Sequence, residues 1–333
     1  MIAQVDLEYL KRRPISALRR IVTRLCFEGR PLTTSHRWLN SIVFAHFAIE
    51  KHLSFWKSIK QPVFIVGSGR SGSTILATLL SFHPHVGLLN EPKAIWHTIH
   101  NYEDVNGNYT TTIPGRYRLY ASDASQTVKQ TARRLFGAYA TLTGSKRIVD
   151  KNPEMIFCIP FVQAIFPDAK FIFLVRNDWD TIHSIESWSL REAVHVNGQI
   201  HDWWGRNRRK WLIMVNELVN NNPLFVGKEA KIRDFIRPID MAAVEWIVTM
   251  QAGIERYKQH PNNIYLLHFE DLIKNPNHSL AQILAFCNLP QDKELIQYAQ
   301  TPLSPPSPYK LVELDNVIAD LFRDQVETVA MLK

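Results

Sequence analysis

Short apolar runs alternate with longer segments of mixed polarity along this 333-residue chain. The runs are rich in Val, Ile, Leu and Phe and are apolar at nearly every position, as in strands buried on both faces of a parallel sheet. The intervening segments carry apolar residues at helical spacing. This alternation predicts an α/β fold, a doubly wound parallel sheet with helices on both faces. The strands are expected near residues 62–67, 86–89, 147–150, 170–175 and 263–268.

The same pattern predicts one main domain with additions at both ends. A helical extension is expected over residues 1–60, the α/β domain over 61–315 and a C-terminal helix over 316–333. Residues 190–240 are expected to form a helical insertion or lid. Within it, residues 195–210 cluster Trp and Arg, which suits either a lid over a site or burial against the domain.

The most informative segment is residues 62–74, PVFIVGSGRSGST. It combines a buried strand, a glycine-rich turn and the start of a helix. Successive backbone N–H groups before a helix N-terminus form a cradle for an anion. Arg70 and the hydroxyls of Ser71, Ser73 and Thr74 add further donors. The segment therefore predicts a phosphate or sulfate site.

Two common nucleotide motifs partly match this loop. Its glycines have the spacing of the P-loop, but Ser73 stands where the phosphate-binding lysine belongs, which disfavours an ordinary ATPase or GTPase. The glycines also match G-x-G-x-x-G, and Glu91 lies about where the ribose-binding carboxylate of a dinucleotide fold is expected. Arg70 counts against that interpretation, because it puts a full charge into a loop that normally works with backbone alone.

Residues 66–74 also resemble the 5′-phosphosulfate-binding loop of sulfotransferases. These enzymes transfer a sulfuryl group from 3′-phosphoadenosine 5′-phosphosulfate (PAPS), leaving adenosine 3′,5′-bisphosphate (PAP). The family loop is close to P-R-S-G-[ST]-[ST], and here a glycine replaces the proline. The resemblance implies that the 5′ end of the nucleotide is held by Gly69, Arg70, Ser71, Gly72, Ser73 and Thr74.

A second motif agrees with the first. Residues 169–184, AKFIFLVRNDWDTIHS, read as a buried strand with Arg176 at its carboxyl end and Ser184 eight residues later in a helix. Family members bind the 3′-phosphate with this pair; taken alone, Arg176 could instead pair with Asp178 or Asp180. A third patch, residues 263–276, resembles the family's structural Y-E-D-L segment with Phe269 in place of Tyr. The resemblance covers about residues 60–310 and is nearest to the protein-tyrosine and bacterial branch.

The resemblance also implies the catalytic groups. Sulfuryl transfer needs a base for the acceptor proton, and the family places a Glu where Glu91 stands. Lys151 would neutralise developing charge together with the loop arginine, since a compact ammonium suits that task. His83 and His85 are rival bases, and Lys93 could line the acceptor side.

A proline-rich loop near the C-terminus offers further nucleotide contacts. Ser304, Ser307 and Lys310 are the candidates, with Lys310 carried into the predicted site, although the loop could equally be a rigid linker. No metal site is expected, because the thirteen histidines are scattered and no cluster has ligand spacing.

Composition narrows the class of protein. A net charge of +8 fits a protein that binds a polyanionic nucleotide, and the basic residues form no recognisable nucleic-acid module. Three distant cysteines favour reduced thiols and a cytoplasmic setting. No signal peptide or membrane span is expected, which favours a soluble bacterial protein. Residues 8–27 are basic with apolar positions at helical spacing, and predict either a membrane-surface helix or a helix packed on the domain with a solvated basic face.

The sequence thus predicts a PAPS-dependent sulfotransferase acting on a hydroxyl or amine. A small natural product, such as a hydroxylated or guanidinium-bearing alkaloid, is the favoured acceptor, with tyrosyl peptides and carbohydrates as alternatives. The other classes left open are an NAD-type oxidoreductase, a P-loop kinase and a membrane-associated nucleotide sensor. No residue chooses the acceptor or the oligomeric state.

Overall fold

A five-stranded sheet forms the centre of the computed structural model, which describes residues 4–196, 198–300, 303 and 311–332. All neighbouring strands of this sheet are parallel, in the order β2-β3-β1-β4-β8. The strands are β1 (Val63–Gly67), β2 (Val86–Asn90), β3 (Arg147–Lys151), β4 (Lys170–Val175) and β8 (Ile264–His268). They confirm the five strands and the doubly wound α/β class expected from the apolar runs.

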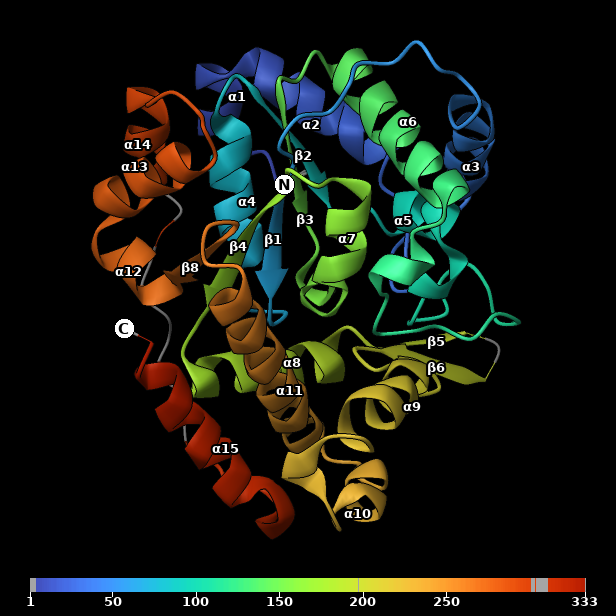
Figure 1. Cartoon of the computed structure of the whole chain (residues 1–333), viewed down its shortest axis with the longest axis vertical. Helices are drawn as coiled ribbons and strands as arrows, with labels where there is room; N and C mark the ends of the chain where they lie inside the picture. The colour runs from blue at the N-terminus through green and yellow to red at the C-terminus, as the bar shows by residue number, and fades with distance from the viewer. Residues whose placement is uncertain (1–3, 197, 301–302, 304–310, 333) are drawn as a thin grey trace.

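Side chains of the central strands alternate between two cores, one on each face of the sheet. Phe64 and Val66 enter one core, whereas Val63 and Ile65 enter the other. A strand buried on both faces needs an apolar residue at every position, which is why β1 is an unbroken apolar run. Figure 1 shows the helices that cover the sheet.

The helices divide between these two cores. On the face that buries Ile65 lie α1 (Leu7–Arg12), α4 (Ser73–Phe82), α12 (Phe269–Lys274), α13 (Pro276–Phe286) and α14 (Lys293–Ala299). The core that contains Phe64 takes side chains from α3 (Leu39–Glu50), α5 (Lys93–Ile99), α6 (Gln126–Thr143), α7 (Ile159–Ile165), α8 (Asp178–Arg191), α9 (Arg209–Met214), α10 (Glu229–Arg233), α11 (Pro238–Gln259) and α15 (Asn316–Ala330). A further helix, α2 (Pro14–Cys26), packs against the edge strand β2.

The insertion expected over residues 190–240 begins with strands, not helices. A small antiparallel sheet is formed by β5 (Val194–Val196), β6 (Gln199–Asp202) and β7 (Gly205–Arg206). Helix α9 and a π-helical turn, Val215–Val219, follow it. Single 3-10 turns lie at Asn101–Glu103, Ala121–Asp123, Pro153–Cys158 and Pro223–Phe225. The sequence pattern missed the small sheet because its strands are only two to four residues long.

The N-terminal extension is helical, as expected, but its helix breaks at Pro14, which starts α2. Helix α2 does pack on the domain. Its orientation differs from the predicted one: Arg20 is buried, while Ile15 and Leu18 face solvent. Within the described part of the chain, no helix is both long and apolar enough to cross a membrane.

One buried carboxyl in the sheet gives a prediction about pH. Asp150 accepts a hydrogen bond of 2.7 Å from the Trp96 indole, and its other oxygen has no partner among the described residues. Burial raises the pKa of Asp150 to about 8 from an ordinary 3.8. Between these values the folded state keeps a proton that the unfolded state has lost, so the free energy of unfolding falls as pH rises.

Replacing Asp150 by Asn should therefore flatten the fall in stability between about pH 5 and pH 8, while keeping an acceptor for Trp96. Urea unfolding of both proteins across this range measures the effect. Equal slopes of unfolding free energy against pH would show that Asp150 is already ionised in the folded protein.

Candidate functional site

The predicted site residues come together because parallel strands end at one edge of the sheet. Lys151 is the last residue of β3, Glu91 directly follows β2, and Arg176 directly follows β4. The pairings of Asn90 and Ile65 with Lys151 bring the end of β3 beside the ends of β2 and β1. In open α/β sheets this carboxyl edge is where ligands bind.

The loop between β1 and α4 has the shape of an anion cradle. Gly72 is the N-cap of α4 with φ +90°, a conformation that favours glycine, and a Cβ there would meet the Phe269 ring at 2.3 Å. No side chain among the described residues caps this helix, so its first N–H groups keep their bonding capacity for a ligand. Ser71 is turned inward and donates 2.7 Å to the Ser68 carbonyl, which braces the turn. Thr74 is exposed and lines a cavity beside the loop.

The two predicted phosphate sites touch each other. Arg70 Nε donates 3.1 Å to Ser184 Oγ, and Arg176 Nη1 donates 3.1 Å to the Arg70 carbonyl. Arg176 also lies over the Phe269 ring at 5.4 Å and contacts Asp180 at 3.4 Å. The pairing with Asp180 considered from the sequence is therefore present, although Arg176 Nε has no partner among the described residues. The loop and the β4–α8 junction are therefore in direct contact.

Glu91 and Lys151 form an ion pair and a hydrogen bond at the same edge. Glu91 adopts φ +49°, which is strained for a residue with a Cβ, and its N–H donates 2.7 Å to the Lys151 carbonyl. Loss of hydration tends to raise the pKa of Glu91. The charge of Lys151 and its hydrogen bond to Glu91 outweigh that effect and hold the pKa below its ordinary value. About half of the Glu91 side-chain surface (48%) stays exposed, and Glu91 lines the same cavity as Thr74. A carboxylate is thus held ionised beside the anion loop.

The rival bases lie elsewhere. His83 and His85 precede β2, at the opposite edge of the sheet, and His83 is buried with its Nε2 against the Pro290 carbonyl. Neither can reach the anion loop, which removes both as bases for this site. Ser304, Ser307 and Lys310 lie outside the described residues.

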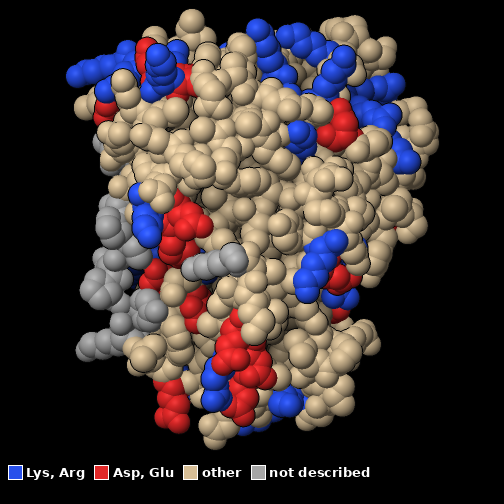
Figure 2. Space-filling model, turned by 60° about the vertical axis from the view of Figure 1, so that its left-hand side comes forward, with Lys and Arg blue, Asp and Glu red and all other residues tan. Residues whose placement is uncertain are grey.

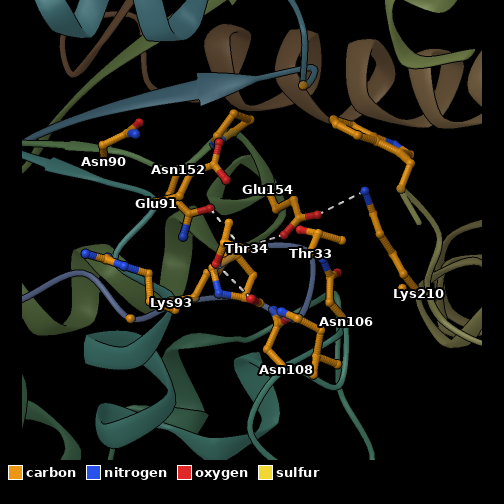
Figure 3. Close-up of a pocket in the computed structure, with 18 of the residues that line it drawn as sticks. Thr33, Thr34, Asn90, Glu91, Lys93, Asn106, Asn108, Asn152, Glu154 and Lys210 are labelled. Atoms are coloured by element: carbon orange, nitrogen blue, oxygen red, sulfur yellow. Dashed lines mark hydrogen bonds and ion pairs between the residues drawn. The ribbon is translucent and has the colours of Figure 1, made fainter. Parts of the chain in front are cut away.

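A cavity of about 310 Å³ adjoins Glu91 and the loop. Lys93 lines it and reaches Glu154 at 2.6 Å and Glu103 at 3.2 Å. Glu154 also binds Lys210 at 3.1 Å, and Lys210 binds Glu245 at 3.0 Å; Figure 3 shows Lys210 reaching Glu154. Burial raises the pKa of Glu154, but the two lysines outweigh it and lower the pKa to about 2. In this network each lysine is paired with two glutamates. The sequence did not predict these ion pairs.

Other walls of the cavity come from distant segments of the chain. Figure 3 shows Thr33 and Thr34 of the N-terminal extension with Asn106 and Asn108, which lie across the cavity from Glu91 and Asn152. The lining is thus largely amide, hydroxyl and charged. It offers hydrogen-bond donors and acceptors rather than an apolar slot.

Trp203 joins this network to the anion loop. Its indole donates 2.6 Å to Glu245, and the Lys210 ammonium lies 4.5 Å from its ring centroid. A Cβ at Gly69 would lie 2.5 Å from the Trp203 ring. This contact explains the glycine that replaces the family's proline: the indole occupies the space that a side chain would need. Trp204 is buried instead, so the Trp cluster serves both as a wall of the site and as core.

The strand order argues against the dinucleotide alternative. In that fold the strand carrying the ribose-binding carboxylate lies next to β1. Here β3 separates β2 from β1, and the carboxylate of Glu91 is bound by Lys151. No group of three His, Cys, Asp or Glu with a geometry suited to a metal occurs among the described residues.

Known proteins match this chain in the region of the site. Residues 62–220 match the model of the Sulfotransferase family. This match, over slightly less than half of the chain, supports the sulfotransferase resemblance of the loop and strand motifs.

Individual relatives are distant. A protein-tyrosine sulfotransferase of Drosophila melanogaster is 24% identical over 218 residues, which cover 65% of this chain and 41% of that protein. An uncharacterized protein of Aquifex aeolicus is 23% identical over 291 residues, covering 86% and 32%. The crystal structure of sulfotransferase STF9 from Mycobacterium avium is similar with a TM-score of 0.49 at 12% identity, covering 99% of this chain and 92% of that one. The chain spans less than half the length of the first two relatives.

Proposed function

We propose that this protein transfers the sulfuryl group of PAPS to a hydroxyl or amine of an acceptor. The observation that carries the proposal is the direct contact of the two anion sites, Arg70 with Ser184 and Arg176 with the Arg70 carbonyl. PAPS carries its 5′-phosphosulfate and 3′-phosphate on one ribose, so its two anionic groups need two such sites side by side. The match of residues 62–220 to the model of the Sulfotransferase family supports this assignment.

The reaction is an in-line exchange at sulfur. The acceptor oxygen or nitrogen forms a bond to sulfur while the bond from sulfur to the 5′-phosphate oxygen breaks, releasing PAP. Glu91 takes the acceptor proton, for which its exposed carboxylate faces the cavity. Lys151, the loop N–H groups and Arg70 stabilise the negative charge that gathers on the sulfuryl and leaving phosphate oxygens.

The ion pair between Lys151 and Glu91 has a consequence for this mechanism. While Lys151 bonds to Glu91, the carboxylate is a weak base, because its pKa is lowered. An anionic nucleotide beside Lys151 competes for that ammonium and raises the proton affinity of Glu91. We infer that binding of PAPS strengthens the base at the moment when it is needed.

The acceptor binds in the cavity next to Glu91. The amide and hydroxyl groups of its walls favour an acceptor with several hydrogen-bonding groups, which suits a polar natural product or a carbohydrate. A tyrosyl peptide is also a candidate acceptor, because the Drosophila relative is a protein-tyrosine sulfotransferase. Turnover of radiolabelled PAPS with tyrosyl peptides, saccharides and hydroxylated or guanidinium-bearing small molecules identifies the class.

Replacing Gly69 by Ala should weaken PAP binding by about tenfold or more, because the new Cβ collides with the Trp203 ring and must displace the loop or the indole. The double variant Gly69→Ala/Trp203→Leu should recover much of the loss, since Leu vacates the space of the indole benzo ring. Calorimetric titration with PAP measures both. If the loss of affinity in the double variant equals the sum of the losses in Gly69→Ala and Trp203→Leu, the two positions are not coupled and the collision is not the cause.

Calorimetry with PAP, NAD and ATP tests the class of protein. The proposal predicts binding of PAP that is tighter than that of either other nucleotide and that needs no divalent metal. Binding of NAD without PAP would assign the protein to the oxidoreductases, and binding of ATP without PAP would assign it to the kinases; either result would contradict the proposal.

A further inference from the structure

The outer face of helix α2 is apolar where a surface helix is normally polar. Ile15 is 76% exposed, Leu18 62% and Leu25 48%. Their spacing, with Val22 between them, puts all of them on one stripe of the helix. The buried face carries Ser16 and Arg20 instead. The helix is thus turned with its hydrophobic side toward solvent.

The basic residues of this region explain that orientation. Arg20 is 2% exposed and makes a two-pronged ion pair with Glu28 at 2.6 and 3.1 Å. Arg13 binds both carboxylate oxygens of Asp292, and Arg19 donates to backbone carbonyls at the end of α6 and around the start of β2. Because Glu28, just beyond the helix, satisfies Arg20 and the domain satisfies Arg13 and Arg19, the apolar residues are left outside.

Further exposed apolar side chains lie on the helices next to α2. Nine of the nineteen exposed large apolar side chains described in this structure lie between residues 7 and 55. Helices α2 and α3 are in contact, and α6 contacts both; all three lie at the upper end of the molecule in Figure 1. The platform, as we name this surface, consists of Leu7, Leu10, Ile15, Leu18, Leu25, Trp38, Ile42, Ile49 and Phe55. An exposed apolar surface of this extent on one end of a domain marks an interaction site.

Positive charge surrounds the platform. Residues 6–60 contain eleven Lys and Arg but only four Asp and Glu, in a chain whose net charge is +8. Lys11, Arg37, Lys57 and Lys60 are exposed and have no acidic partner among the described residues. Figure 2 shows Lys and Arg predominating over the upper end of the molecule, whereas acidic side chains gather lower down.

We propose that the platform docks on the surface of an anionic lipid bilayer. Exposed apolar side chains enter the headgroup region while the surrounding cations attract anionic lipid, the two terms that drive interfacial binding. A second copy of this chain fits less well, because two such ends would bring like charges together. The proposal does not depend on the reaction proposed above.

Cosedimentation with vesicles tests the docking surface. Wild-type protein should bind vesicles of phosphatidylcholine and phosphatidylserine in equal parts, bind phosphatidylcholine alone weakly, and lose binding as salt rises. The variant Ile15→Ser/Leu18→Ser should bind at least about tenfold less, since two large apolar side chains no longer enter the bilayer.

The matched control is Val226→Ser/Ile236→Ser, which removes two equally exposed apolar side chains far along the chain and should bind like wild type. Thermal unfolding confirms that both variants are folded. The proposal would be overturned if wild-type protein bound neither kind of vesicle. It would also be overturned if the control variant lost as much vesicle binding as Ile15→Ser/Leu18→Ser. A dimer in sedimentation without lipid, abolished by Ile15→Ser/Leu18→Ser, would assign the platform to a second copy instead.

Discussion

Replacing Glu91 by Gln should lower kcat by roughly 10²- to 10⁴-fold while leaving PAP affinity nearly unchanged. Gln keeps the size of the side chain and an acceptor for Lys151, but it cannot take the acceptor proton. The measurement is steady-state turnover of PAPS with the acceptor that the panel identifies, together with calorimetry for PAP. Glu255→Gln, at an exposed position of α11, is the matched control and should behave like wild type.

Two outcomes would contradict this role. Unchanged kcat would remove Glu91 from proton transfer, and a parallel loss of PAP affinity would make it a binding residue. The pH profile adds an independent check. Because the pKa of Glu91 lies below its ordinary value, any fall in kcat/KM through its protonation should occur below about pH 4.3 in the free enzyme.

Replacing Arg176 by Ala should weaken PAP binding by roughly 10- to 100-fold, the range expected for losing a charge-assisted hydrogen bond to phosphate. The loss should be specific to one phosphate. Adenosine 5′-monophosphate, which lacks the 3′-phosphate, should bind the variant and wild type almost equally. Calorimetric titration of both nucleotides into both proteins measures this difference.

A control separates the ligand contact from a structural role of Arg176. Its guanidinium also binds Asp180 and the Arg70 carbonyl, so its removal could disturb the loop. Asp180→Asn removes the charge of that ion pair without removing the guanidinium and should retain PAP affinity. Equal losses for adenosine 5′-monophosphate and PAP in Arg176→Ala would show that Arg176 shapes the loop rather than binding the 3′-phosphate.

The sheet and the anion loop were predictable because local sequence encodes them. Strands buried on both faces must be apolar throughout, so β1 and β4 stand out without any tertiary information. Gly72 marks a backbone shape that the loop requires. Placement of Glu91 and Lys151 near the loop followed from their positions after strands, since parallel strands end at a common edge.

The contacts between distant segments were not predictable in this way. The ion pair between Glu91 and Lys151 joins residues 60 positions apart, and the Glu154–Lys210–Glu245 network spans three separate elements. No local pattern specifies which charges meet. Trp203 illustrates the same limit: its cluster suggested a lid or core, but only the fold shows its ring against Gly69.

The orientation of α2 is the clearest difference between expectation and structure. Helical spacing correctly predicted an amphipathic helix, but not which side the domain would bury. Burial normally follows hydrophobicity. Here Glu28, two residues beyond α2, and Asp292 of the domain offer carboxylates, which bind Arg20 and Arg13. The sequence periodicity carries no information about such partners.

A crystal structure of the protein with PAP would show whether the two basic sites hold one nucleotide. We expect the 5′-phosphate on the backbone N–H groups of residues 69–74 and the 3′-phosphate between Arg176 and Ser184, in one molecule. Density for PAP in another cavity, or with either phosphate away from its assigned residues, would contradict it.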